Sequence, residues 1–286
     1  MEVQIVTKSG QGSGWTRESG WVPPDVDLSK PSVARMYDYY LGGKDNYPVD
    51  REACEVIDSV APSTRALAVN NRRFLQRAVR HLAREEGVRQ FLDNGSGLPT
   101  QDNVHQVAQR EDPASRVVYI DNDPVVLSHG RALLADNDQT TVIAADMRDI
   151  DGILSDSNVL NLLDFDQPVA VLYASALHCI PDDDDPGGLM RRVMDRMAPG
   201  SCVVLSHLVS DDAAVREQIT DFMLEATGGQ WGRVRTADEV RPWFEGFELL
   251  PPGLVEASQW AADPGDRVQD TLEWIEFAGV ARKPRP

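Results

Sequence analysis

The sequence predicts an α/β fold built on a doubly wound, mostly parallel sheet, and three observations support this. From about residue 88 onwards, strand-like runs alternate with helical patterns, as in such sheets. Four of the five runs are apolar almost throughout, which is typical of strands buried on both faces. Of the 286 residues, 42% are hydrophobic and 26% are charged, so the chain carries enough apolar side chains for one large core.

The first part of the chain precedes the sheet. Residues 1–30 are polar and rich in Gly, Ser and Pro, so we expect them to form a flexible tail. Residues 31–87 are predicted to form a helical extension that covers the sheet as a lid. Its three helices are expected over 32–41, stopped by the pair Gly42–Gly43, over 50–60, and from about Asn70 to Gly87.

Residues 88–226 are predicted to form the core. We expect its strands over 90–92, 117–120, 141–145, 169–173 and 202–205. We expect its helices over 100–110, 125–135, 150–154, 189–197 and 213–226. Residues 227–286 are predicted to form a cap insertion followed by a C-terminal β-hairpin, with strands over 247–250 and 271–280 at the sheet edge, where prolines are tolerated.

Charge and cysteine content argue against several classes of protein. The chain has 28 basic and 46 acidic residues, a net charge of −18, which opposes binding to nucleic acid or to an anionic membrane. We find neither a secretory signal nor an apolar run of the ~20 residues that span a bilayer, so we expect a cytoplasmic protein. Three widely spaced cysteines predict no disulfide framework. We also expect no metal site, and interpret 182–185, four consecutive aspartates, as a solvated turn.

The residues that follow the predicted strands indicate a nucleotide-like ligand, because ligands of such sheets bind at the carboxyl ends of the strands. Gly95 and Gly97 follow the first strand, where glycines allow a tight turn and a close approach to a ligand. The helix after them is expected to present free N–H groups at its N-terminus. Asp121 ends the second strand, 24 residues beyond Gly97, and is suited to a ribose diol. After the third strand, Asp146 and the Met147 N–H are suited to the edge of an adenine.

Two adenosine-containing cofactors fit this pattern, a nicotinamide dinucleotide and S-adenosylmethionine (SAM). The dinucleotide motif GxGxxG requires a third glycine, but Thr100 occupies that position. Asp93, two residues before the first glycine, suits a sulfonium and an ammonium group better than a dinucleotide. The pattern therefore favours SAM.

Longer motifs resemble one family. They are Phe91-Leu92-Asp93-x-Gly95-x-Gly97-Leu98-Pro99-Thr100, the stretch 119–134, Ala176-Leu177-His178-x-x-Pro181, and, near the N-terminus, 35–46 and 71–75. Together they resemble the actinobacterial S-adenosyl methyltransferase family, formerly a domain of unknown function. The resemblance runs from about residue 31 to the C-terminus. It implies a class I methyltransferase, Rossmann-like sheet of seven strands with the last antiparallel, with SAM as cofactor and S-adenosylhomocysteine (SAH) as product. Asn94 departs from the family pattern, where an apolar residue is expected.

The site prediction combines these motifs with the N-terminal block. Tyr37 is expected in a lid over the cofactor and Arg72 near the cofactor carboxylate, and His178 is a weak candidate for a general base. Aromatic residues of the late insertion, Trp231, Trp243, Phe244, Phe247 and Trp260, are either packing residues or the wall of an acceptor pocket. The predicted cofactor-binding residues are Tyr37, Arg72, Asp93, Gly95, Ser96, Gly97, Asp121, Asn122, Asp146, Met147 and Ala174.

The predicted function is methyl transfer to an unidentified small molecule. One alternative is a SAM- or SAH-binding protein without turnover, in a regulatory role. A second, less favoured one is an NAD(P)-dependent oxidoreductase. The sequence predicts neither the acceptor nor the oligomeric state.

Overall fold

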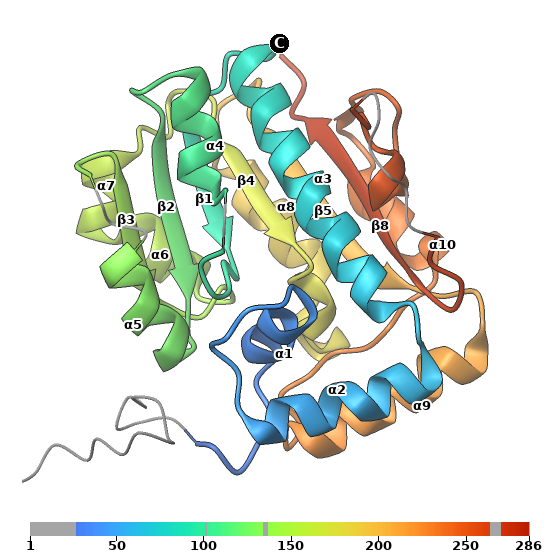
Figure 1. Cartoon of the computed structure of the whole chain (residues 1–286). Coiled ribbons are helices and arrows are strands. Elements are labelled where there is room, and N and C mark those ends of the chain that lie inside the picture. The colour runs from blue at the N-terminus through green and yellow to red at the C-terminus, as the bar shows by residue number, and fades with distance from the viewer. Residues whose placement is uncertain (1–26, 101, 134–136, 264–269, 286) are drawn as a thin grey trace, which may run out of the picture.

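One sheet of eight strands forms the centre of the computed structural model, which describes residues 27–100, 102–133, 137–263 and 270–285 (Figure 1). The strand order is β3-β2-β1-β4-β5-β8-β6, and β7 also pairs with β8. The first five strands are parallel, whereas β8 is antiparallel to β5, β6 and β7. The strands are β1 (Gln90–Asn94), β2 (Arg116–Asp121), β3 (Thr140–Ala144), β4 (Ala170–Ala174), β5 (Cys202–Val209), β6 (Glu248–Leu249), β7 (Val255–Glu256) and β8 (Ile275–Arg282).

Helices cover both faces of the sheet (Figure 1). On one face lie α3 (Thr64–Arg84) and α4 (Val104–Glu111), with α5 (Pro124–Leu133) beside β3. On the other lie α6 (Ile150–Ser155), α7 (Ser157–Leu162) and α8 (Pro186–Asp195). Successive residues of the strands alternate between the two layers, so that Phe91 packs under α3 while Leu92 packs on the opposite face, and both are buried.

A third layer lies across the carboxyl ends of the parallel strands. It consists of α1 (Val33–Tyr40), α2 (Pro48–Val60) and α9 (Ala213–Ala226), which lie below the sheet in Figure 1. These helices share an apolar cluster with the first turns of α3, through Met36, Ile57, Leu67 and Ile219. Ligands of parallel sheets bind at this edge, so the third layer is placed to cover a site.

The predicted fold class is confirmed, including the antiparallel last strand, but several elements differ. The sheet has eight assigned strands because the short β7 joins the expected seven. The expected hairpin strands do pair, as β6 and β8, but over two residues only and with β7 between them in the sequence. The third helix begins at Thr64 instead of Asn70, α4 begins at Val104 instead of Thr100, and α7 was not predicted. Most of the predicted tail, residues 1–26, lies outside the described residues.

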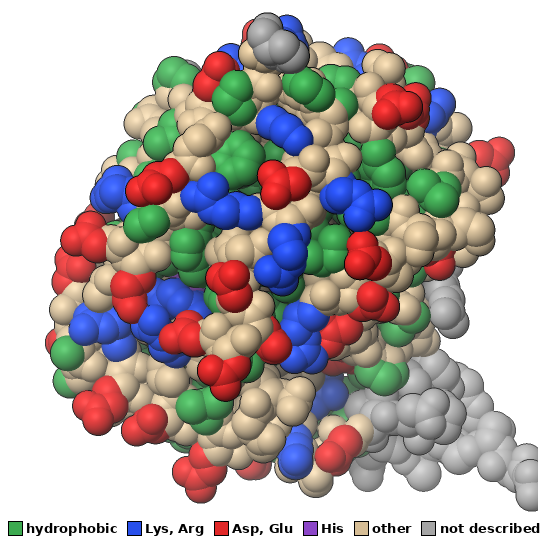
Figure 2. Space-filling model, turned by 180° about the vertical axis from the view of Figure 1, so that it is seen from behind, with side chains coloured by type: hydrophobic (Ala, Val, Ile, Leu, Met, Phe, Trp, Pro, Cys, Tyr) green, Lys and Arg blue, Asp and Glu red, His purple; other side chains and the backbone are tan. Residues whose placement is uncertain are grey.

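Acidic and basic side chains are interspersed over the rear face of the molecule (Figure 2). Of the four consecutive aspartates, Asp182 pairs with Arg233 and Arg235, and Asp184 pairs with Arg148. Among the described residues, no group of His, Cys, Asp or Glu is arranged to hold a metal ion. No helix in the described ranges is long and apolar enough to cross a membrane.

Candidate functional site

A cavity of about 610 Å³ lies between the carboxyl ends of the parallel strands and the helices that cover them. Small-molecule sites commonly have volumes of about 300–1,000 Å³, so it is large enough for a ligand. Every residue of the site prediction lines this cavity, although its role there stays a prediction. They are Tyr37, Arg72, Asp93, Gly95, Ser96, Gly97, Asp121, Asn122, Asp146, Met147, Ala174 and His178.

The turn after β1 is shaped by its two glycines. Gly95 and Gly97 have φ values of 70° and 65°, in the left-handed region that other residues avoid. A Cβ on Gly95 would lie 2.9 Å from Cε of Met147 and 3.0 Å from Cβ of Ala176, so these neighbours would have to shift. The Gly95 N–H donates to the carbonyl of Ile120 (2.9 Å), and the Gly97 N–H to Oδ2 of Asp121 (2.9 Å). The turn is therefore joined to the end of β2.

The helix that follows this turn does not supply the free N–H groups expected there. It begins at Val104, well beyond Gly97, and is capped by Asn103 and Gln106. Oδ1 of Asn103 already accepts from the Thr100 N–H (3.0 Å) and from Nη2 of Arg72 (3.1 Å). That part of the prediction is wrong, because the chain is not helical from Gly95 to Thr100 and no residue of α4 lines the cavity.

Two buried carboxyl groups face the cavity. Asp93 and Asp121 are 4% and 8% exposed. Burial raises the pKa of Asp93 to about 7, although the nearby Arg72 opposes the change. Burial also raises the pKa of Asp121, whose carboxylate accepts from the backbone N–H groups of Gly97 and Asp123. A cationic ligand beside Asp93 would favour its ionised form.

Asp146 is less available than the sequence suggested. Its carboxylate is held by the Arg148 guanidinium, with Nη2 of Arg148 2.6 Å from Oδ2 of Asp146. Arg148 also donates to Asp184 (2.9 Å), and it lowers the pKa of Asp146. A hydrogen bond from Asp146 to an adenine amine would therefore have to share the carboxylate with Arg148. The side chain of the neighbouring Met147 lies against the glycine turn.

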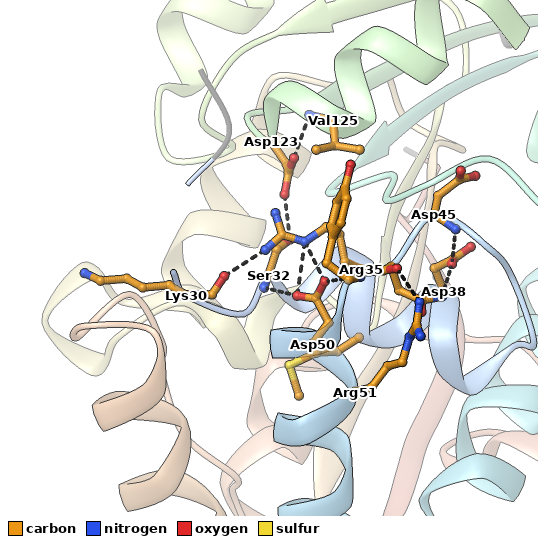
Figure 3. Close-up of polar contacts among 12 residues, drawn as sticks. Lys30, Ser32, Arg35, Asp38, Asp45, Asp50, Arg51, Asp123 and Val125 are labelled. Carbon is orange, nitrogen blue, oxygen red and sulfur yellow. Dashed lines mark hydrogen bonds and ion pairs between the residues drawn. The ribbon is translucent and has the colours of Figure 1, made fainter. Parts of the chain in front are cut away.

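The helix α1 lines the cavity. Polar contacts on both sides of its first turn hold it in place (Figure 3). Arg35, which is buried, donates to Asp50 through Nε (2.9 Å) and to the carbonyl of Lys30 (2.8 Å). Ser32 stands at the N-cap position of α1, but its side chain makes no cap hydrogen bond and donates instead to Oδ2 of Asp123 (2.5 Å). This contact links the covering segment to the loop that follows β2.

Tyr37 also points from α1 into this region. Its hydroxyl donates to the carbonyl of Ala68 (3.1 Å) and accepts from Nδ2 of Asn71 (3.0 Å), both on α3. Asn71 in turn accepts from the Ser206 hydroxyl (2.6 Å). The covering helix is thus connected to the sheet through hydrogen bonds as well as apolar packing.

The cavity continues beyond the predicted cofactor residues into an apolar part, which we call the acceptor lobe. Side chains from α1, α2, α3, α9 and the loops around them form its walls. They are Met36, Tyr40, Ile57, Leu67, Ala68, Leu208, Ile219, Met223, Trp231 and Trp274. Within the described part of the chain, several buried polar atoms that line the cavity have no hydrogen-bond partner: Nδ1 of His178, Nε1 of Trp231, Nε1 of Trp274 and Oε2 of Glu276.

The late aromatic residues separate in the structure. Trp231 lines the acceptor lobe, whereas Trp260 packs edge-on against Phe74 under α3. Phe244, together with the partly buried Trp243 and Phe247, belongs to the apolar layer on the α8 face. Packing is therefore the role of four of these five residues.

Sequence reasoning missed Ser175 and Glu276, which line the cavity next to Ala174. The signal for Glu276 was a single acidic residue inside the apolar run Trp274–Val280, where burial of a charge is costly. For Ser175 there was no local signal beyond its place after the fourth strand.

His178 is buried in the cavity wall, and this burial, with the nearby Arg235, lowers its pKa to about 3. Its ring lies between the rings of His207 and Trp231. His207 is held on both nitrogens, by the carbonyl of Leu208 (2.8 Å) and by Arg235 (2.9 Å). A histidine that resists protonation is a weak proton acceptor, so this environment favours a structural role for His178.

Comparison with known proteins gives the family. A family model described as S-adenosyl methyltransferase matches residues 19–284. A solved structure of a candidate methyltransferase from Thermobifida fusca is 40% identical, with a TM-score of 0.84, and covers 93% of this chain and 100% of its own. A DUF574 family protein from Streptomyces avermitilis is 38% identical, with a TM-score of 0.82, over 89% of this chain and 98% of its own. A search of curated proteins gave no match.

The cavity residues also fit the cofactor of that family. Asp93 and Asp121 supply buried carboxyl groups for a cation and a diol, and the glycine turn leaves room for close contact. Because the family model spans nearly the whole chain and two relatives share more than a third of its residues, the chain belongs to the S-adenosyl methyltransferase family, whose methyl donor is SAM.

Proposed function

We propose that this protein transfers the methyl group of SAM to a small molecule bound in the acceptor lobe. The observation that carries the proposal is the continuity of the cavity. The same space of about 610 Å³ is lined by the residues of the cofactor motif and by the apolar walls between α1, α2 and α9. A protein that only bound SAM would not need the second part.

In this proposal the residues of the cofactor motif bind and orient SAM. Asp121 accepts from the ribose hydroxyls, with Asn122 beside it, and Asp93 faces the cationic end of the cofactor. The glycine turn with Ser96 follows the cofactor backbone, and Met147 borders the adenine.

SAM supplies an electrophilic methyl group on a positively charged sulfur. The protein's contribution is to hold the acceptor in line with the sulfur–methyl bond and to exclude water, and positioning of this kind supplies a large part of the barrier reduction. Tyr37 and the rest of α1 cover the cavity, and the Ser32–Asp123 and Arg35–Asp50 contacts hold them in place. These contacts make 31–47 a lid in this proposal.

The alternatives make different demands on the cavity. A nicotinamide-dependent oxidoreductase would need a dinucleotide, for which the chain lacks the third glycine at Thr100. A regulatory SAM-binding protein would leave the acceptor lobe without a role. We further propose a cytoplasmic location, which is compatible with the free thiols of Cys54, Cys179 and Cys202.

Calorimetric titration of the full chain with SAM, SAH and NAD tests the cofactor part of the proposal. We expect SAM and SAH to bind and NAD not to bind. Methyl transfer is then tested with SAM labelled at its methyl group and an extract of small molecules. Label that appears in a small molecule supports transfer, whereas binding of SAM without any transfer would favour the regulatory alternative.

A further inference from the structure

The carboxyl group of Glu276 lies in the cavity wall without a complete set of partners. Glu276 is 0% exposed and lines the cavity. Its Oε1 accepts from the Ser175 hydroxyl, whereas its Oε2 has no hydrogen-bond partner in the described part of the chain. A buried carboxyl oxygen without a partner is costly, so such an atom indicates a ligand that completes its hydrogen bonding.

Neighbouring hydroxyl groups lie close to this carboxyl group without forming a hydrogen bond to its second oxygen. Ser206 lies nearby on β5, but its only hydroxyl proton is donated to Oδ1 of Asn71 (2.6 Å). The Ser206 oxygen accepts from the N–H of Ser175 (2.9 Å). Ser175 has a φ of 56°, a left-handed conformation that is unfavourable for serine and that occurs often at functional sites. The hydrogen bonds of Ser175 therefore aim its hydroxyl at Glu276.

The position of Glu276 in the sheet places it on the acceptor side. It lies on β8, and β8 is separated from β1 by β4 and β5. At about 4.8 Å between neighbouring strands, β8 is about 14 Å from the strand that carries Asp93. Glu276 pairs in register with Leu208, which lines the acceptor lobe, and Trp274 of the same lobe lies two residues before it. Its contact with Ser175 brings it next to the end of β4, where Ala174, a predicted cofactor residue, also lines the cavity.

We propose that Glu276 is the residue that binds the reacting group of the acceptor and takes its proton. The acceptor is then a mainly apolar molecule that presents an O–H or N–H group to Oε2. This inference rests on the proposed function, because it assigns the second substrate of the same cavity.

The step balances without any other reagent. The lone pair of the acceptor oxygen or nitrogen forms a bond to the methyl carbon, and the sulfur–carbon bond breaks with its electron pair staying on sulfur. The proton of the acceptor's O–H or N–H group passes to Oε2 of Glu276. The products are the methylated acceptor, SAH and a protonated carboxyl group, which returns its proton to water when the products leave.

Electrostatics agree with this geometry. Burial, together with the carboxylate of Glu256 on β7, raises the pKa of Glu276 to about 8, while the hydroxyls of Ser175 and Ser206 oppose the shift. The other titratable groups that interact with it are the buried Tyr37 of α1 and Cys179 after β4. A proton acceptor works best when its pKa lies near the working pH, which Glu276 meets better than His178.

Binding of matched probe molecules tests whether Glu276 holds the O–H or N–H group of the acceptor. The protein is saturated with SAH at about pH 8.5. Calorimetry then measures its affinity for naphthol and for methoxynaphthalene, which lacks the hydrogen-bond donor. A second pair is indoline and N-methylindoline. We expect at least one donor probe to bind at least about tenfold more tightly than its methylated partner, as for a hydrogen bond to a charged group. In Glu276→Gln this preference should fall to about threefold or less.

The control variant is Glu273→Gln, which changes a carboxylate on the same segment that bonds to Ser63 outside the cavity. It should keep the wild-type preference. Both variants should bind SAH within about threefold of wild type, which also shows that they are folded. Failure of wild type to bind SAH would instead contradict the proposed function itself.

The inference would be overturned if Glu276→Gln kept the wild-type preference for the donor probes, or if none of the four probes bound the SAH complex. A tenfold loss of SAH affinity in Glu276→Gln would also overturn it, because that result would assign Glu276 to the cofactor. A donor probe that binds is then tested with SAM. We expect transfer with a kcat that rises with pH through about 8 and falls at least about 100-fold in Glu276→Gln at an unchanged KM for SAM. Equal kcat values, or no transfer to the bound probe, would refute the proton-acceptor role.

Discussion

Binding of SAM should become tighter as the pH rises, because the buried Asp93 must ionise to face a cation. The pKa of Asp93 is raised to about 7 by burial. A bound cation favours the carboxylate, so binding releases a proton and the affinity increases with pH. For a group of pKa about 7, the ionised fraction is about one eleventh at pH 6 and about three quarters at pH 7.5. The affinity should therefore rise about eightfold between these values.

Calorimetry in two buffers of different ionisation enthalpy measures both the affinity and the number of protons released. Asp93→Asn should bind SAM more weakly at pH 7.5 and should lose most of the pH dependence. Asp58→Asn is the matched control, since burial also raises the pKa of Asp58 but its side chain does not line the cavity. An affinity that does not change with pH, or a slope that survives in Asp93→Asn, would refute the assignment of Asp93.

Other substitutions test the remaining parts of the site. Asp121→Ala should weaken SAM binding by about 1.5–3 kcal/mol. It should also lower the free energy of unfolding, because the N–H groups of Gly97 and Asp123 lose their acceptor. Unchanged calorimetric affinity in a folded variant would contradict the ribose role. Ser32→Ala removes the contact to Asp123 and should speed amide hydrogen exchange of residues 31–47 in the free protein. Bound SAM should slow this exchange again. Exchange equal to that of wild type would mean that the Ser32–Asp123 contact does not hold the lid. Glu276→Gln should raise the Tm more at pH 8 than at pH 5. In the wild type, burial of the Glu276 carboxyl costs little stability below the pKa that this group has in the unfolded chain, and the cost grows as the pH rises to about 8. An equal effect at both pH values, measured by calorimetry, would mean that Glu276 is ionised at no cost.

The sheet and the meeting of the predicted cofactor residues at one cavity were predictable because their signals are local. Asp93, Gly95 and Asp121 each follow a strand-like run directly, and the carboxyl ends of parallel strands meet at one edge. The five strand-like runs therefore predict that these residues lie close together at the edge of the sheet. The start of α3 at Thr64 was not predicted, because Pro62 indicates a break in helical structure just before the helix-forming residues 64–69.

Apart from Trp231, the walls of the acceptor lobe were not predictable, because they come from distant parts of the sequence. Leu208, Trp274 and Glu276 meet helices α1, α2 and α9 only after β8 inserts antiparallel beside β5. The sequence also did not indicate that Arg148 would hold Asp146, or that Ser32 would bond across to Asp123 instead of capping its own helix. Such contacts depend on tertiary packing and leave no periodic pattern in the chain.

The central claim is that one cavity binds SAM on the strand ends with its sulfur facing the acceptor lobe. A crystal structure of the full chain with SAH tests it most directly. We expect the ribose hydroxyls on Asp121 and the sulfur beside Ala174 and Ser175, open towards Trp231, Trp274 and Glu276. SAH bound elsewhere, or bound with its sulfur turned away from this lobe, would contradict the account.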